Sequence, residues 1–280
     1  MKISTGPSFG ILISLASAIA VLASAVLAFV AAREMPAFLD LGTHQLRAKV
    51  RGQGSPSVVF ETFGPAPLEI WNGVEPKISK SSRTFSYDHA GYWGSPSGPR
   101  PRDARRIATE LHAALAKAKV PPPYLLVGYS FGGPYTRVFA NLFPDEVAGM
   151  ILVDPTQERF MQWLHRAMPA VNVVSASDQA REDEWGCQNA SMQQAEASRL
   201  PNVPLTLISA SPPASHPYRA LVTRLQAEHA LWLTQYPQAR HVIADNTDHG
   251  LVVSHPEVVV GEIRRMLDEV QKKQSLPARP

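Results

Sequence analysis

The chain has 280 residues, of which 45% are hydrophobic and 18% are charged, and it contains 25 prolines and 17 glycines. This composition excludes collagen-like, coiled-coil and disordered proteins, and the length suits one large α/β domain or two small ones. The 27 lysines and arginines barely exceed the 24 aspartates and glutamates, so a dedicated nucleic-acid binder is also excluded. A single cysteine, Cys187, excludes an internal disulfide.

The first 32 residues form an apolar segment of their own. Residues 9–32 carry no charged side chain, and as a helix they would be about 36 Å long, enough to cross a bilayer core of about 30 Å. This length favours an uncleaved anchor, whereas the small residues Val30, Ala31 and Ala32 suit a signal-peptide cleavage site. Both alternatives stay open for residues 1–32, and either one makes the protein membrane-anchored or exported.

After Arg33, short β-type runs alternate with amphipathic helical runs. This alternation predicts an α/β fold with a mostly parallel sheet and helices on both faces. The first two runs flank residues 42–44, which predict a hairpin turn. Eight strands are expected, at residues 38–41, 45–50, 57–61, 83–87, 124–128, 148–153, 203–209 and 240–244.

Three further segments complete the predicted architecture. Residues 103–119 repeat apolar side chains on one helical face, and a second stripe of this kind lies within residues 256–270. Residues 156–202 interrupt the alternation with a polar stretch that also holds aromatic side chains, which predicts a helical insertion over one end of the sheet. It is interpreted as a lid that shapes a pocket, or else as a surface decoration. The polar tail at residues 271–280 is expected to be flexible.

The most informative stretch joins the fifth strand to a helical pattern. An apolar run leads directly into Gly128-Tyr129-Ser130-Phe131-Gly132, which matches Gly-x-Ser-x-Gly. Small residues beside the serine let the strand and helix approach at a sharp, strained turn. Ser130 is therefore the candidate nucleophile, and the backbone N–H of Phe131 is a candidate donor to an oxyanion.

A serine hydroxyl needs a base to take its proton, and His249 is the preferred candidate. It lies in a loop just beyond the eighth strand, and such loops meet ligands at the carboxyl edge of a parallel sheet. His89, in the loop after the fourth strand, is the rival.

These residues resemble the α/β-hydrolase superfamily, and in particular a bacterial branch with Gly-x-Ser-Phe-Gly-Gly-Pro-Tyr around the nucleophile. Ser86 to Tyr92, Pro144 to Gly149 and Val153 to Pro155 belong to the same pattern, which covers about residues 37–270. The resemblance implies one hydrolase domain and cleavage of an ester, amide or related acyl bond. Its bacterial members suggest the inner membrane, the periplasm or the exterior as the location.

The resemblance also implies an acid and a second oxyanion donor. The usual place for the acid, after the seventh strand, holds no carboxylate, so Asp154 after the sixth strand is assigned by elimination, ahead of Glu158, Glu228, Asp245 and Asp248. In the loop after the third strand, Phe63 or Gly64 must donate because Pro65 and Pro67 have no N–H. Gly64 is the choice made here.

The sequence therefore predicts a serine hydrolase that acts on a small-molecule acyl substrate. No cofactor, metal or nucleic-acid partner is expected, because no P-loop, metal-ligand cluster or dinucleotide motif is present. Tyr129 stands where the resemblance leads one to expect histidine, which leaves open a non-catalytic, ligand-binding member of the fold with a vestigial triad. Epoxide hydrolases and haloalkane dehalogenases of this fold are disfavoured because they use an aspartate as the nucleophile.

Overall fold

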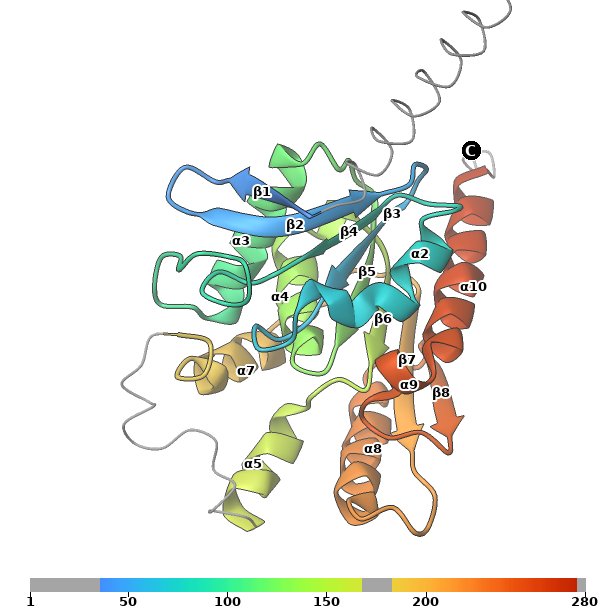
Figure 1. The fold of residues 1–280 in the computed structure, drawn as a ribbon. Helices are drawn as coiled ribbons and strands as arrows, with labels where there is room; N and C mark the ends of the chain where they lie inside the picture. The colour runs from blue at the N-terminus through green and yellow to red at the C-terminus, as the bar shows by residue number, and fades with distance from the viewer. Residues whose placement is uncertain (1–35, 168–182, 276–280) are drawn as a thin grey trace, which may run out of the picture. The chain divides into compact units, whose positions relative to one another are not determined.

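The computed structural model describes residues 36–167 and 183–275, whose strands form one eight-stranded sheet (Figure 1). The spatial order is β1-β2-β4-β3-β5-β6-β7-β8. β2 is antiparallel to both β1 and β4, whereas all pairs from β4 to β8 are parallel, as predicted. The strands are β1 (Ala37–Asp40), β2 (Gln45–Arg51), β3 (Ser57–Glu61), β4 (Thr84–Tyr87), β5 (Tyr124–Tyr129), β6 (Val147–Val153), β7 (Leu205–Ser211) and β8 (Arg240–Asp245).

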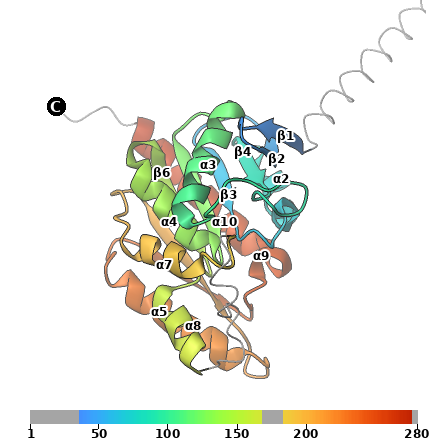
Figure 2. The same ribbon diagram turned by 90° about the vertical axis from the view of Figure 1, so that its left-hand side faces the viewer.

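Helices cover both faces of this sheet, which confirms the predicted α/β-hydrolase fold (Figures 1 and 2). One core lies between the sheet and α3 and α4, and the other lies between the sheet and α2, α9 and α10. The helical segments are η1 (Leu68–Gly73), α2 (Glu75–Ile78), α3 (Ala104–Lys117), α4 (Gly132–Leu142), η2 (Pro144–Glu146), α5 (Glu158–Ala167), α7 (Gln188–Glu196), α8 (Arg219–Leu233), α9 (Leu251–Ser254) and α10 (Pro256–Ser275).

The central strand β5 is buried along its whole length. Its side chains alternate between the two cores: Leu126 packs with the α3 and α4 side, and Leu125 and Val127 pack with the α10 side. A strand buried on both faces reads as a continuous apolar run, which explains its sequence. β5 is therefore a rigid support for the residue that follows it.

The helix predicted at residues 103–119 is α3, and its start has a clear cause. Asp103 is the N-cap, and its carboxylate accepts a hydrogen bond of 2.9 Å from the backbone N–H of Arg106. Ile107, Leu111 and Leu115 are each at most 1% exposed and fill the core beside α4.

Most predicted boundaries shift by one or two residues, and the start of β7 and the end of α10 have an identifiable cause. β7 begins at Leu205 instead of Val203, because Val203 donates its N–H to the carbonyl of Pro201 in a turn. α10 continues to Ser275, beyond the apolar stripe that ends at residue 270. Lys273 pairs with Glu269 one turn earlier, and cations in a last helical turn are favourable to the helix dipole.

The insertion between β6 and β7 carries helices, as predicted. α5 packs on α8 through Phe160, Leu164 and Leu225, and α7 lies against α3 and α4. In Figure 1, α5 lies beyond the carboxyl end of β6, and α8 lies beside β7, on which it packs. Within the two ranges described, no helix has the length and apolar character of a membrane span. The predicted anchor or signal peptide at residues 1–32 lies outside the described residues.

Candidate active site

Ser130 occupies the sharp turn between β5 and α4. Its φ of 56° is in the left-handed region, which is strained for a residue with a side chain. Two glycines make the turn possible: a Cβ on Gly128 would lie 2.4 Å from Oγ1 of Thr136, and one on Gly132 would lie 2.4 Å from the carbonyl oxygen of Glu61. The turn thus places Ser130 at the carboxyl end of β5, where the motif predicted it.

The structure brings Ser130, His249 and Asp154 together from three loops. The Ser130 Oγ lies 2.9 Å from Nε2 of His249, and Nδ1 of His249 lies 2.6 Å from Oδ2 of Asp154. Since the carboxylate only accepts, Nδ1 carries the proton, which leaves Nε2 as the acceptor for the serine hydroxyl. This order of contacts is the one that a serine nucleophile requires.

Asp154 is 1% exposed and follows β6 directly. Its Oδ1 accepts a hydrogen bond of 3.0 Å from the N–H of Ala210, so both carboxylate oxygens have partners. Burial alone would raise the pKa of Asp154, but the hydrogen bond and charge of His249 outweigh it and hold that pKa below its ordinary value. The carboxylate is therefore ionised at neutral pH.

A buried histidine behind Asp154 was not singled out in the sequence. Nε2 of His229 lies 2.7 Å from the carbonyl oxygen of Pro155, so it carries a proton, and Nδ1 lies 2.8 Å from Oγ of Ser209. Burial lowers the pKa of His229, which favours the neutral ring. His229 lies on α8, and folding brings its Nδ1 to 3.9 Å from Oδ1 of Asp154. No sequence motif marks this residue.

Tyr129 has a structural role beside Ser130. Its hydroxyl donates a hydrogen bond of 2.7 Å to the backbone carbonyl of His249, and the two rings are 5.2 Å apart. The loop that carries the histidine is therefore tied to the end of β5. The side chain of His249 remains 45% exposed, so a substrate can reach it.

The loop after β3 corrects one prediction. The N–H of Gly64, chosen as the second oxyanion donor, donates a hydrogen bond of 3.0 Å to Oε2 of Glu184 and is therefore occupied. The N–H of Phe63 donates no hydrogen bond within residues 36–167 and 183–275. The ring of Phe63 packs 5.2 Å from that of Phe131, the residue after Ser130. Of the two alternatives in this loop, Phe63 is the one with a free donor in the described residues.

His89, the rival base, lies in a buried cluster of charges instead. Its Nε2 is 2.6 Å from Glu61 and its Nδ1 is 2.8 Å from Glu184. Burial opposes the charged ring, but the charges and hydrogen bonds of these two carboxylates prevail and raise the pKa of His89 to about 10. His89 is thus a buried cation that cannot accept a proton at neutral pH.

We expect this cation to make stability depend on alkaline pH. Because the pKa of His89 is about 10 in the folded chain and about 6.5 when unfolded, its contribution is complete below pH 6.5 and is lost as the pH rises toward 10. Urea unfolding between pH 6.5 and 9.5 should show the free energy of unfolding falling by up to about 1.4 kcal/mol per pH unit. His89→Gln should flatten this slope, whereas His112→Gln, at a half-exposed ion pair with Glu146, should not. An unchanged slope in His89→Gln would contradict the assignment.

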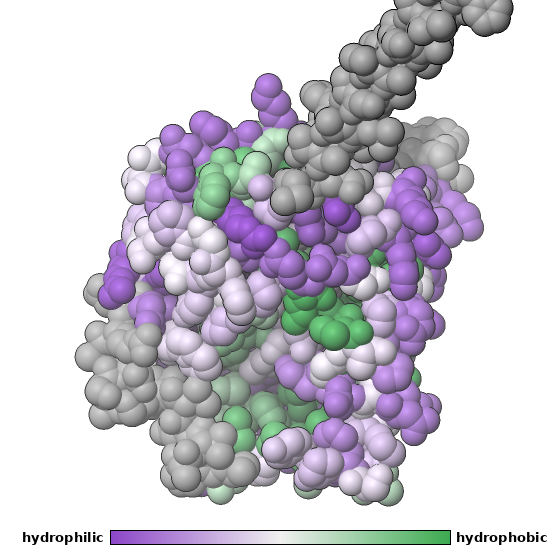
Figure 3. Space-filling model, in the orientation of Figure 1, coloured by the Kyte–Doolittle hydropathy of each residue, from purple (hydrophilic) through white to green (hydrophobic). Residues whose placement is uncertain are grey.

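A cavity of about 430 Å³ opens beside His249 and Asp154. Its walls come mainly from apolar side chains of α5 and α8, namely Phe160, Met161, Leu221, Val222 and Leu225. Figure 3 shows hydrophobic side chains gathered in the lower part of this face, in the region between these two helices. The cavity therefore offers an apolar group a place next to the three-residue cluster.

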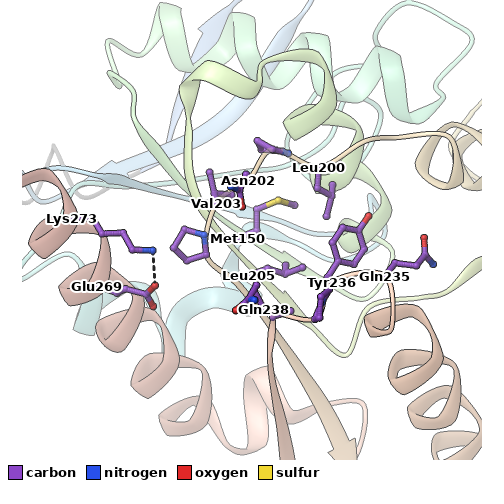
Figure 4. Close-up of a pocket in the computed structure, with 14 residues that line it drawn as sticks. Met150, Leu200, Asn202, Val203, Leu205, Gln235, Tyr236, Gln238, Glu269 and Lys273 are labelled. Carbon is purple, nitrogen blue, oxygen red and sulfur yellow. Dashed lines mark hydrogen bonds and ion pairs between the residues drawn. The ribbon is translucent and has the colours of Figure 1, made fainter. Parts of the chain in front are cut away.

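A second cavity, of about 570 Å³, lies at the opposite edge of the sheet (Figure 4). Leu205 and Ala239, at or before the starts of β7 and β8, border it, whereas Ser130 follows the end of β5. Its only charged lining residues, Glu269 and Lys273, pair with each other on α10. Ser130, His249 and Asp154 are absent from its lining, whereas His249 and Asp154 line the smaller cavity, which is therefore the candidate substrate pocket.

Comparisons with known proteins agree with this architecture. A family model described as the alpha/beta hydrolase fold matches residues 56–181. An esterase from Thermogutta terrifontis superposes with a TM-score of 0.58 at 18% identity, over 84% of this chain and 99% of its own. The epoxide hydrolase CorEH superposes with a TM-score of 0.60 at 14% identity, over 84% of this chain and 99% of its own. At these identities the likeness shows the fold alone.

Among curated relatives, a protein of Hormonema carpetanum named as a probable transporter, efuK, is 32% identical over 128 residues, which are 43% of this chain and 18% of that protein. The chain spans less than half the length of the curated relatives that it matches. The matched family model, the sheet order and the solved neighbours together show that the chain has the α/β-hydrolase fold.

Proposed function

We propose that this protein is a serine hydrolase that cleaves an ester or related acyl bond through an acyl-enzyme. The observation that carries the proposal is the chain of contacts from Ser130 through His249 to Asp154, with distances of 2.9 and 2.6 Å. The serine sits on a strained turn at the carboxyl edge of the sheet, and the base is both exposed and oriented.

In the proposed reaction, the Ser130 Oγ attacks the carbonyl carbon while His249 Nε2 takes the hydroxyl proton. The imidazolium then gives this proton to the leaving oxygen, and the carbon–oxygen bond breaks to leave an acyl-serine. A water molecule, deprotonated by His249, attacks the acyl carbon and restores Ser130. Asp154 stabilises the imidazolium, and the N–H groups of Phe131 and Phe63 stabilise the oxyanion.

A fluorophosphonate probe, which reacts quickly only with an activated serine, tests the proposal. The full chain in detergent should be labelled on the peptide that contains Ser130, as identified by mass spectrometry. Absence of labelling in a folded chain would instead support a ligand-binding protein with a vestigial triad. Epoxide hydrolysis is not favoured, because the turn after β5 presents a serine where that reaction uses an aspartate.

The apolar cavity beside His249 is the proposed site for the acyl group. We expect kcat/KM for p-nitrophenyl hexanoate to exceed that for the acetate, because the longer chain buries more apolar surface there. Leu225→Trp fills the cavity and should lower kcat/KM for the hexanoate about 10–100-fold while sparing the acetate. Leu231→Trp, on the exposed face of the same helix, is the control. Equal losses for both esters would argue against this site.

The apolar segment at residues 9–32 leads us to propose that the protein is exported or held at a membrane. The mass of the mature protein distinguishes retention of residues 1–32 from their removal. Recovery of the unprocessed chain in the soluble fraction of a cell lysate would contradict both alternatives.

A further inference from the structure

The loop from Glu61 to Gly64 is held by two buried carboxylates. Oε1 of Glu61 accepts a hydrogen bond of 2.9 Å from the N–H of Thr62, and Oε2 of Glu184 accepts one of 3.0 Å from the N–H of Gly64. The N–H of Phe63 donates to no group in the described ranges, and it lies between these two anchored amides. Its peptide group is therefore fixed from both sides.

His89 joins the two carboxylates. Its ring nitrogens lie 2.6 Å from Glu61 and 2.8 Å from Glu184, and all three side chains are at most 3% exposed. Nε of Arg102 lies 3.9 Å from Glu184 while its terminal nitrogens pair with buried Glu110 at 2.8 and 3.1 Å, so three carboxylates share two cations. Tyr87 donates a further hydrogen bond of 2.7 Å to Glu61. Buried charges that are paired in this way hold their geometry, because any departure leaves an uncompensated charge away from water.

The members of this cluster come from distant parts of the chain. Glu61 ends β3, His89 follows β4, and Glu184 belongs to the insertion between β6 and β7, 120 residues from its partner Gly64. None of them contacts Ser130 or His249 in the hydrogen bonds of the described residues. The cluster therefore acts on the chemistry indirectly, through the backbone of the β3 loop and through Tyr135 of α4, whose hydroxyl donates to Glu184 and whose ring packs on Phe131.

We infer that Glu184 and His89 are positioning residues that aim the Phe63 N–H at the oxyanion. This inference rests on the proposed function and deepens it. With this role for Glu184, the insertion between β6 and β7 both orients an oxyanion donor and forms a wall of the proposed substrate pocket. A donor that is already oriented costs no reorganisation in the transition state, which is why its alignment affects kcat more than substrate binding.

The test measures kcat, KM and inhibition by phenylboronic acid in the full chain, with p-nitrophenyl acetate as substrate. Glu184→Ala should lower kcat about 10–100-fold with KM nearly unchanged. It should also weaken inhibition by phenylboronic acid by a similar factor, because the tetrahedral boronate adduct uses the same oxyanion donors. Glu184→Gln keeps an acceptor for Gly64 and should fall between the wild type and the alanine variant. His89→Gln should reproduce the kcat loss.

Glu75→Gln is the matched control, since Glu75 is equally buried, pairs with Lys49 and lies beside the first strand residues of β4. It should lower the melting temperature while leaving kcat per folded molecule unchanged. If Glu184→Gln and His89→Gln behave like Glu75→Gln, the inference is overturned. A Ser130→Ala variant that kept its activity would instead overturn the proposed function, so the two failures are distinguishable.

Discussion

Ser130→Ala should lower kcat for p-nitrophenyl acetate by about 10⁴- to 10⁶-fold, the largest effect expected of any single substitution in this chain. The alanine removes the only oxygen that lies 2.9 Å from Nε2 of His249, so no group remains in place to form the acyl-enzyme. KM should change little, because the apolar cavity on α5 and α8 is intact. The measurement is steady-state hydrolysis of the purified full chain, with folding checked by circular dichroism.

Ser86→Ala serves as the control for loss of a serine hydroxyl. Ser86 is fully buried on β4 and donates to Glu75, outside the reactive cluster. This variant should be less stable but should retain its kcat. Wild-type turnover by Ser130→Ala would remove the basis of the proposed mechanism, because hydrolysis would then proceed without this hydroxyl.

Asp154→Asn should lower kcat by about 10⁴-fold. The amide can donate to Nδ1 of His249, which favours the tautomer whose Nε2 carries the proton and can no longer accept the proton of Ser130. The substitution also removes the negative charge that stabilises the imidazolium. Because Ala210 still donates to the retained oxygen, the local fold should persist.

Asp248→Asn is the control for this second prediction. Asp248 lies one residue before His249 but is exposed, and its ion pair with His216 is 3.5 Å long. Its substitution should leave kcat close to that of the wild type in the same ester assay. A large loss in Asp248→Asn together with a small loss in Asp154→Asn would reverse the assignment of the acid.

Much of the fold was predictable because the apolar side chains mark the sheet. β5 is buried on both faces, so it appears as an unbroken apolar run, and α3 places its core residues at helical spacing. The end of α10 was not predictable in this way. Its last turns are stabilised by ion pairs between exposed side chains, which leave no apolar period in the sequence.

The candidate site was predictable where local geometry demands particular residues. Glycines at 128 and 132 are needed by the turn around Ser130, while Asp154 directly follows β6 and His249 lies in the loop after β8, at the same edge of the sheet. Glu184 gave no such signal, because it lies in a polar insertion without periodicity and acquires its partners only through folding. The hydrogen bond from the N–H of Gly64 to Glu184 leaves Phe63 as the candidate oxyanion donor in this loop. The sequence alone could not make this choice between Phe63 and Gly64.

The candidate catalytic residues and the walls of the apolar cavity lie on different elements, and this separation has a consequence for engineering the protein. Ser130 and Asp154 directly follow strands and His249 lies in the loop after β8, whereas the cavity walls stand on α5 and α8, which pack on each other through Phe160, Leu164 and Leu225. A library of variants confined to Phe160, Met161, Leu221 and Leu225 should therefore yield many folded, active members with different ester preferences. Selection for new substrates can begin from these four positions without disturbing the reacting groups.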